Sequence, residues 1–467
     1  MKAIIPEIDE SLKRPCYLQL YDYIKNAILS GEIAEGEKLP SLRRLAKSLA
    51  LSLTTISLAY NQLSVEGYIY SKAASGYFIN DVSLARRSAN ATTGGFGADF
   101  AETAMPAERA SNQYDLSCFD FNKWKKCFNK ILTEYPHLLL SESDPQGEPA
   151  LRYEISKYLY SSRGVVCNPS QIMIGAGTQQ ITGQLSLFLA RMSINHVTVE
   201  DPCYLPVKNI FRDRGFALTA VAVGKNGINI QKLPANIMSA VYVCPSNQFP
   251  TGAVMPVGKR YELLEWAKRN DSIIIEDDYD SELRYFGKPI PALQGLDTHQ
   301  RVVYLGSFSS TLFPSVKISY MVLPPQMAEI SSSLTNDYSQ TCSKAEQLTL
   351  ALFMEHGYYQ TNIRKLRSLY SQKLQAVLNS IHNYAHNFIT PVNTSSGVNM
   401  IINVRSGKTS DILCAEANGL GVAVFPVSIY TSESNPDASP LIFYYNQIPL
   451  ELIDDTVKTL VERWRQS

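Results

Sequence analysis

The sequence predicts a multidomain α/β protein. A small N-terminal domain of three helices and a β-hairpin precedes a large domain with a mostly parallel sheet flanked by helices. The 467 residues exceed what one hydrophobic core usually serves. Residues 81–113 are rich in Ala, Gly, Ser, Thr and Asn without sustained periodicity, which is typical of a linker. Beyond them, β-branched apolar runs alternate with helical stretches. We therefore expect domains at 1–80 and 114–467, joined by a flexible linker at 81–113.

Composition excludes several classes of protein. Lys plus Arg and Asp plus Glu number 43 each, so net charge argues neither for nor against nucleic acid. No apolar run is long enough to cross a bilayer, and Glu7, Asp9 and Glu10 stand where a signal peptide needs apolar residues, so we expect a cytoplasmic protein with no membrane partner. The eight cysteines include no Cys-x-x-Cys pair and form no zinc-like pattern with the six histidines. They are interpreted as reduced packing residues, and no metal site is expected.

The first eighty residues predict three helices followed by two strands. Apolar residues at helical spacing predict a first helix over 17–29. Ser41 and Ser52 are N-cap candidates for the second and third helices. The third helix carries apolar residues on one face, namely Ile56, Ala59, Tyr60 and Leu63. Two short strands joined by a small turn follow at 68–70 and 76–79.

This order of elements is typical of a winged helix-turn-helix, whose third helix enters the major groove of DNA. The stretch from Lys38 to Val65 carries four basic residues and no acidic one, which suits phosphate contact. The alternative is that these basic residues are the solvated face of a helix, and charge alone does not decide between the two. The candidate DNA contacts are Arg43, Arg44 and Lys47 on the second helix, Ser52, Thr54 and Thr55 at the start of the third, and Lys72 in the wing turn.

A resemblance supports the DNA-binding interpretation. Residues 15–80 closely resemble the GntR family of bacterial repressors and activators, which implies a double-stranded DNA partner. The family usually has arginine after the serine that opens the recognition helix, whereas this chain has Leu53, a change expected to alter sequence preference. The matching positions are Tyr17, Gln19, Leu20, Gly31, Gly36, Leu39, Pro40, Ser41, Arg43, Leu45, Ala46, Ser52, Thr54, Thr55, Ile56, Ala59, Tyr60, Leu63, Glu66, Gly67 and Tyr68.

The large segment contains five apolar runs that predict strands buried on both faces of a sheet. They lie at 196–199, 240–243, 272–275, 301–305 and 318–322. Polar residues follow four of them, and ligands of open α/β sheets bind beyond the carboxyl ends of strands. Polar residues at a single strand end are weak evidence, because loops are solvent-exposed and often polar. Polar residues at four strand ends together predict a ligand pocket. These strand ends are Glu200-Asp201, Pro245-Ser246-Asn247, Glu276-Asp277-Asp278-Tyr279 and Gly306-Ser307-Phe308-Ser309.

From about Tyr114 onward the chain resembles fold-type I aminotransferases, in the version fused to GntR domains that is called the MocR group. The resemblance implies pyridoxal 5′-phosphate as cofactor and a head-to-tail homodimer. The matching stretches are 144–152, 163–165, 177–180, 200–204, 245–252, 276–282 and 306–309.

The resemblance also implies a role for individual residues. Asp277 would face the pyridine nitrogen, Tyr279 would hydrogen-bond the ring hydroxyl, and Tyr204 would stack on the ring. Gly177 and Thr178 would open a helix that cradles the phosphate. Without the other strand-end groups, Asp277 would be read as a helix cap or a surface acid. The remaining cofactor-binding candidates are Asn247, Ser307, Ser309 and Lys317.

Three positions depart from the aminotransferase pattern. Ser310 stands where the family has the lysine that forms a Schiff base with the cofactor, and a hydroxyl cannot form an imine. Lys317 stands at the phosphate-binding arginine, which keeps the charge but loses the planar fork, and its use as a substitute imine partner is disfavoured. Ile442 aligns, more loosely, with the arginine that holds a substrate carboxylate, and the stretch 396–399 differs from its family counterpart.

The preferred hypothesis is a transcriptional regulator whose aminotransferase-like domain dimerises and senses a small-molecule effector. In it the domain is catalytically inactive, and pyridoxal phosphate binds noncovalently if at all. The second hypothesis is an active pyridoxal-phosphate-dependent aminotransferase with a regulatory DNA-binding domain, favoured by the retained Asp277, Tyr279 and Tyr204. The third is a structural pseudoenzyme that binds DNA constitutively.

Overall fold

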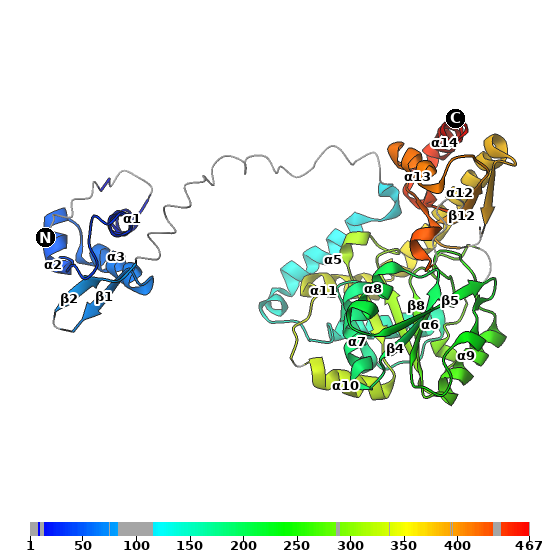
Figure 1. Cartoon of the computed structure of the whole chain (residues 1–467), viewed down its shortest axis with the longest axis horizontal. Helices are drawn as coiled ribbons and strands as arrows, with labels where there is room; N and C mark the ends of the chain where they lie inside the picture. Colours follow the sequence, from blue (N-terminus) through cyan, green and yellow to red (C-terminus); the bar gives the residue numbers. More distant parts are fainter. Residues whose placement is uncertain are drawn as a thin grey trace. The chain divides into compact units, whose positions relative to one another are not determined.

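A computed structural model describes residues 8–9, 14–73, 75–82, 115–285, 290–335, 337–392, 394, 396–432 and 440–466. The chain divides into two compact units, Met1–Ala107 and Glu108–Ser467 (Figure 1), and each is described by itself. The predicted linker at 81–113 lies outside the described residues from residue 83 onward. Among the described helices, none has the length and apolar character needed to cross a membrane.

The small unit contains the predicted three helices and hairpin. Ser41 Oγ accepts the backbone N–H of Arg44, and Ser52 Oγ accepts that of Thr55, so both predicted N-caps are confirmed. The predicted apolar face of the third helix is fully buried in the core of this unit. The elements are α1 (Cys16–Leu29), α2 (Leu42–Leu49), α3 (Leu53–Val65), β1 (Ile69–Lys72) and β2 (Gly76–Ile79).

A third extended segment joins the wing, which the sequence did not predict. The N–H of Leu39 donates to Tyr77 O at 2.9 Å, and the N–H of Ile79 donates to Glu37 O at 3.1 Å. This segment leads directly into α2, so the residues just before the second helix are hydrogen-bonded to the hairpin. Lys72 is the last residue of β1 and pairs with Gly76 of β2, so it lies at the end of a strand rather than in the turn.

The large unit is built on an eight-stranded sheet in the order β3-β10-β9-β8-β7-β4-β5-β6. Strands β5, β4, β7, β8 and β9 are parallel neighbours, which confirms the mostly parallel sheet. Strand β10 is antiparallel to both of its neighbours, and β6 is antiparallel to β5. The strands are β3 (Ile172–Gly175), β4 (His196–Asp201), β5 (Ala217–Gly224), β6 (Gly227–Ile228), β7 (Ala240–Val243), β8 (Ile273–Asp278), β9 (Val302–Ser307) and β10 (Ser319–Val322).

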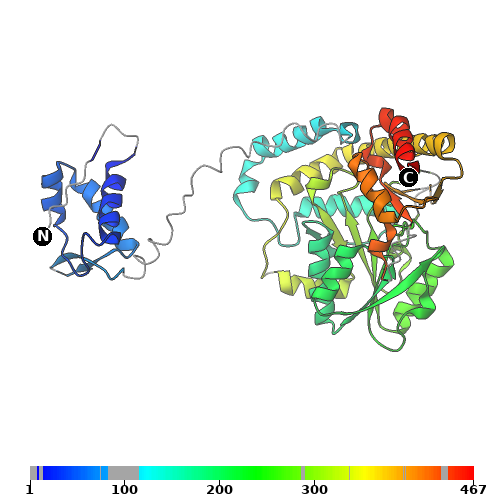
Figure 2. The same cartoon turned by 45° about the horizontal axis from the view of Figure 1, so that its top comes forward.

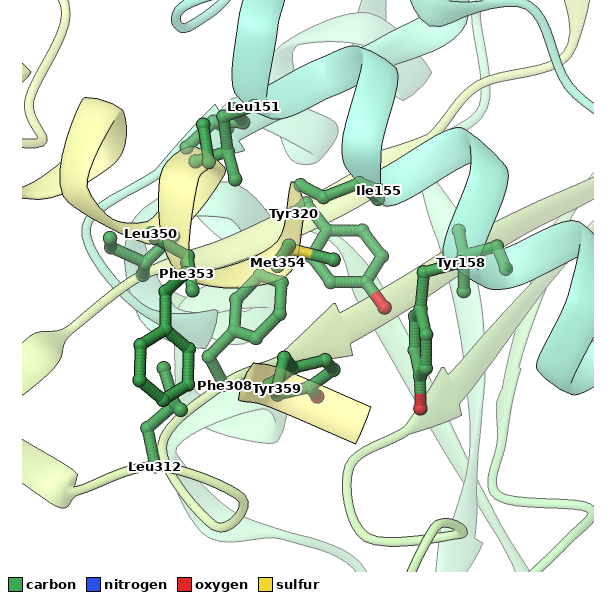
Figure 3. Packing of buried hydrophobic residues seen from close by; sticks show 14 of the residues in the cluster. Leu151, Ile155, Tyr158, Phe308, Leu312, Tyr320, Leu350, Phe353, Met354 and Tyr359 are labelled. Carbon is green, nitrogen blue, oxygen red and sulfur yellow. The ribbon is translucent and has the colours of Figure 1, made fainter. Parts of the chain in front are cut away.

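Helices cover both faces of this sheet. Helices α7 (Thr178–Arg191), α8 (Leu205–Asp213) and α10 (Pro325–Thr335) pack on one face. The other face carries α5 (Phe121–Glu134), α6 (Pro149–Arg163), α9 (Val257–Arg269) and α11 (Lys344–Glu355). Figure 3 shows part of this second layer, where Leu151, Ile155 and Tyr158 of α6 approach residues of α11 and the sheet. Strand residues alternate between the two cores, as a two-residue period requires.

A smaller layer follows the long helix α12 (Tyr358–Ala385). It is a four-stranded antiparallel sheet in the order β11-β12-β14-β13, packed against α12, α13 and α14 around its own core. Figure 2 shows these C-terminal elements, in yellow to red, gathered at one end of the large unit. Their bounds are β11 (Ile389–Val392), β12 (Met400–Val404), α13 (Ser410–Gly419), β13 (Val424–Pro426), β14 (Leu441–Phe443) and α14 (Ile453–Arg465).

Candidate functional site

A cavity of about 500 Å³ opens at the carboxyl ends of the central strands, where the sequence predicted a pocket. Its wall combines residues after β3, β4, β7, β8 and β9 with residues of the C-terminal layer. The described lining is Ala176, Gly177, Thr178, Gln179, Tyr204, Tyr242, Cys244, Phe249, Asp277, Tyr279, Ser307, Ser309, Ser310, Pro314, Lys317, Val398, Asn399, Tyr430 and Tyr444.

Eight of the nine predicted cofactor-binding residues lie in this wall, although they come from four separate stretches of sequence. The exception is Asn247. Its amide donates to Asp280 at 2.7 Å and accepts from Ser396 at 3.1 Å. The structure thus places Asn247 in a buried network that ties the large sheet to the C-terminal layer, beside rather than in the cavity wall.

One end of the cavity is built to attract an anion. Gly177 precedes α7 with φ +89°, a conformation that favours glycine, and the first turn of the helix opens into the cavity. The hydroxyls of Ser307 and Ser309 lie 3.3 Å apart, and Ser319 donates to Ser307 at 3.0 Å. Lys317 is exposed and adds a positive charge, and it is the one cation in the described lining. A helix N-terminus, hydroxyls and an ammonium are the kinds of group that favour an anion such as phosphate.

The other end holds a buried carboxylate. Asp277, at the end of β8, is 7% exposed and accepts a hydrogen bond from the hydroxyl of Tyr242 in β7. Burial raises the pKa of Asp277 to about 6, Tyr242 lowers it in part, and the charge of Asp278 raises it further. A carboxylate in this setting favours a ligand that brings a proton to it.

Asp278 serves the opposite side of the same strand. It forms a 2.8 Å ion pair with Arg163 and accepts from the hydroxyl of Tyr304 at 2.5 Å. Because side chains alternate along β8, Asp278 points to the buried ion pair and Asp277 faces the cavity. The motif stretches 163–165 and 276–282 are brought together by this pair.

Sequence reasoning missed Tyr242. Its signal was a single polar hydroxyl inside the otherwise apolar run Ala240–Val243, next to a strand predicted to end in acids. The side chain is 1% exposed and lies in the same core as Ile275, its register partner in β8. A buried tyrosine hydroxyl needs a partner, and Asp277 supplies it.

Ser310 lies in the cavity wall, just after Ser307 and Ser309, at the end of the cavity that favours an anion. Its hydroxyl donates to the backbone carbonyl of Tyr279 at 2.7 Å. This contact links the loop after β9 to the loop after β8. The side chain offers the cavity a hydroxyl and no amine.

The side of the cavity next to the C-terminal layer is aromatic. Phe249 packs edge-on against Tyr430, with ring centroids 4.9 Å apart, and similarly against Tyr204 and Tyr279. Ile442 is fully buried in this cluster and does not line the cavity. No guanidinium belongs to the described lining, so this side offers stacking surfaces rather than a carboxylate clamp.

In the small unit the predicted DNA contacts lie close together on the surface around α2 and α3. Arg43, Arg44 and Lys47 are exposed, and no ion pair within the described residues involves them. Thr54 is exposed, whereas Thr55 is half-buried and shares its hydroxyl with Ser52 at 2.8 Å. Ser52 therefore acts as the predicted cap, and its contact with DNA stays a prediction. Lys72 is exposed at the end of β1.

Two family models match the chain. The model described as "Bacterial regulatory proteins, gntR family" covers residues 16–79, and the model described as "Aminotransferase class I and II" covers residues 110–389. A solved archaeal alanine:glyoxylate aminotransferase shares the fold of the large unit. It has 21% sequence identity and a TM-score of 0.68, and the match covers 76% of this chain and 90% of that one.

Several transcriptional regulators match over nearly the whole chain. The uncharacterised helix-turn-helix regulator YdeL of Bacillus subtilis is 37% identical, with 99% of both chains covered. The probable rhizopine catabolism regulatory protein MocR of Rhizobium meliloti is 29% identical, with 94% of this chain and 91% of that one covered. The pyridoxine biosynthesis transcriptional regulator PdxR of Corynebacterium glutamicum is 29% identical, with 90% and 89% covered. The chain belongs to the GntR/MocR-type helix-turn-helix transcriptional regulators, which carry an aminotransferase class I and II domain.

Proposed function

We propose that this regulator binds a phosphorylated vitamin B6 compound noncovalently in its large domain, without transaminase activity, and that this ligand changes its affinity for an operator. The observation that carries the proposal is one cavity that combines a phosphate-binding end, a buried carboxylate and Ser310 in place of an amine. The name of the relative PdxR, a pyridoxine biosynthesis regulator, points to the same class of ligand.

The residues present fit pyridoxal phosphate or a close analogue. Gly177, with its positive φ, leaves the start of α7 open to a phosphate, and Thr178, Ser307, Ser309 and Lys317 add hydroxyl and ammonium donors there. Tyr279 offers a phenol and Tyr204 an aromatic face, as the resemblance requires. We assign the pyridine nitrogen to Asp277 because no other acidic side chain belongs to the described lining.

The residues of this chain bind and orient the ligand rather than react with it. Asp277 holds the proton of the ring nitrogen, and Tyr242 holds Asp277 in place. In aminotransferases the bound cofactor supplies an electron sink for chemistry at an amino acid. That chemistry requires an amine on the protein and a clamp for the substrate carboxylate, and Ser310 and the aromatic wall supply neither.

The same reasoning assigns roles along the chain. Residues 1–80 bind double-stranded DNA, and 114–467 sense the effector and form a head-to-tail homodimer. A symmetric dimer presents two DNA-binding domains, as a site with two half-sites requires. The protein acts in the cytoplasm, where its DNA target lies.

A second candidate function, an active aminotransferase, is favoured by the eight predicted cofactor residues that share one cavity. It requires an imine to a lysine, and Lys317 is the one lysine in the described lining. In the proposed binding mode this ammonium contacts the phosphate and does not reach the aldehyde carbon.

The test compares ligands with and without an aldehyde. Pyridoxal 5′-phosphate and pyridoxine 5′-phosphate should bind the purified full-length protein within about threefold of each other, because no imine contributes to affinity. Neither should produce a borohydride-reducible adduct on a lysine. The variant Ser310→Lys should form such an adduct with pyridoxal 5′-phosphate and should then prefer it over pyridoxine 5′-phosphate.

Each alternative outcome has a clear meaning. A reducible adduct on any lysine of the wild-type protein would contradict the noncovalent proposal and favour the enzyme. Absence of binding by both compounds, with Ser310→Lys equally inert, would favour a structural pseudoenzyme that binds DNA constitutively. The folded state of the variant is checked by its thermal unfolding.

A further inference from the structure

Helix α3, the recognition helix, carries no charged side chain along its thirteen residues. Its buried face consists of Ile56, Ala59, Tyr60 and Leu63. Outside that face three apolar side chains of the helix are exposed, because Leu53 is 49%, Leu58 is 48% and Val65 is 85% exposed. Thr54, Asn61 and Gln62 are the exposed polar residues of the helix, and Gln62 donates to Glu66 at 2.6 Å.

Positive charges on the elements next to α3 indicate that its exposed side chains face a negatively charged partner. The exposed Arg43, Arg44 and Lys47 lie on α2, which packs against α3, and Lys72 lies on β1, which follows it. None of these four cations forms an ion pair within the part of the chain that the structure describes. An apolar helix face with unpaired cations on the neighbouring elements is complementary to a major groove bounded by phosphates.

The chemistry of base edges then limits what α3 can read. Guanine is most often recognised by a bidentate arginine or lysine, and α3 has neither. The 5-methyl group of thymine is recognised by apolar contact, which Leu53, Leu58 and the methyl group of Thr54 provide. Asparagine pairs in a bidentate manner with the N6 and N7 of adenine, and Asn61 is exposed on the same face.

We infer that α3 reads A·T base pairs, with Leu53 and Leu58 contacting thymine 5-methyl groups in the major groove. This inference rests on the proposed DNA-binding function and gives it a sequence class. Leu53, which stands where the family usually has arginine, is then a residue that determines sequence specificity. Affinity comes from the phosphate contacts of the cations, and discrimination comes from the apolar face.

The test uses operator duplexes selected from a random library by the full-length wild-type protein. Positions of the selected sites that α3 protects from major-groove modification should be A·T pairs. Replacing a protected thymine by uracil removes the methyl group and keeps base pairing and charge. Each such replacement at a contacted position should weaken wild-type binding about three- to fivefold, as expected for one buried methyl.

Variants then assign the effect to residues. The penalty for uracil should disappear at one position in Leu53→Ala and at a different one in Leu58→Ala, because each side chain supplies the contact that the methyl loses. Leu53→Met keeps an apolar contact and should keep the penalty, which controls for misfolding of the alanine variant. The salt dependence of binding should be the same in all three variants.

Four outcomes would overturn the inference. The first three are G·C pairs at the protected positions, no uracil penalty in the wild-type protein, and a penalty unchanged in both alanine variants. A fourth is that Leu58→Ala alters the oligomeric state and leaves DNA binding unchanged, which would make this face an interface between copies of the chain. Operator binding with a normal salt dependence would leave the DNA-binding function standing in every case, whereas failure to select any duplex would contradict that function itself.

Discussion

The DNA-binding surface and the cavity present their charged and polar groups in different ways. Around α3 the cations are exposed and unpaired, so binding there gains from released counterions and depends steeply on salt. In the cavity, burial raises the pKa of Asp277, whereas most of the other polar groups, such as Ser307 and Ser309, are half-buried. Binding there should depend on pH and geometry more than on salt. From this difference we expect long-range charge to guide the chain to DNA and short-range complementarity to select the proposed effector.

The largest expected effect tests the electrostatic half of this comparison. The triple variant Arg43→Ala/Arg44→Ala/Lys47→Ala should lower operator affinity on the order of 100-fold at ~0.15 M salt, because each phosphate contact contributes about 0.9 to the salt slope. The slope of log affinity against log salt should become shallower by about 3. Fluorescence anisotropy across a salt series measures both quantities.

A charge-matched triple variant in the large unit provides the control. Lys232→Ala/Lys268→Ala/Arg269→Ala removes the same charge from exposed positions far along the sequence. It should leave the salt slope unchanged. If both triple variants lose affinity equally, the effect reflects overall charge and not contacts by α2.

The next effect tests the cavity. Asp277→Asn should weaken binding of pyridoxine 5′-phosphate roughly 10- to 100-fold, because it removes a charge-assisted hydrogen bond to the ring nitrogen. The same variant should stabilise the ligand-free protein above pH 6. Since the pKa is raised from 3.8 to about 6, the native state binds the proton more tightly than the unfolded state, and its stability falls as pH rises through this window.

The size of the stability gain in Asp277→Asn is set by the pKa shift of Asp277 in the wild-type protein. At pH 8 the free energy of unfolding of Asp277→Asn should exceed that of the wild type by up to about 3 kcal/mol, and the gap should shrink as pH falls from 6 toward 4. Denaturant unfolding at pH 5 and pH 8 without ligand measures it. A gap that grows toward low pH would show that Asp277 is a stabilising ion in the native state, contrary to its assigned role.

The smallest effect separates two roles of one side chain on the DNA-binding surface. Ser52→Ala should cost about 1 kcal/mol of stability through loss of the cap. Ser52→Asp keeps the cap and should restore stability, yet it brings a negative charge toward the phosphates and should weaken operator binding. Equal operator affinity of Ser52→Asp and the wild type would show that Ser52 acts as a cap only.

Periodicity and caps carried most of what the sequence could predict. The order of elements, the caps at Ser41 and Ser52, the buried face of α3 and the pocket beyond the strand ends follow from local patterns, and the structure confirms them. The residues that meet in the cavity were found because a family resemblance joins stretches far apart in sequence. Composition alone would have left Asp277 as a surface acid.

The remaining features depend on tertiary pairing, which local patterns do not encode. The apolar run at 318–322 predicts a strand but not its direction, and β10 lies antiparallel between β3 and β9. Strands β11, β13 and β14 are only three or four residues long, too short for a period to emerge. Asn247 matched a motif but bonds Asp280 and Ser396, because the motif specifies a position and not the direction of the side chain.

We propose that a noncovalent effector in the cavity is coupled to the DNA-binding surface. The direct measurement is operator affinity of the full-length protein, by anisotropy at one salt concentration, with and without saturating pyridoxine 5′-phosphate. We predict a change of at least about fivefold, and by reciprocity the operator should change the affinity for pyridoxine 5′-phosphate by the same factor. Asp277→Asn should lose the change at the same ligand concentration. An operator affinity that is unaltered by a ligand shown to bind the cavity would contradict this coupling.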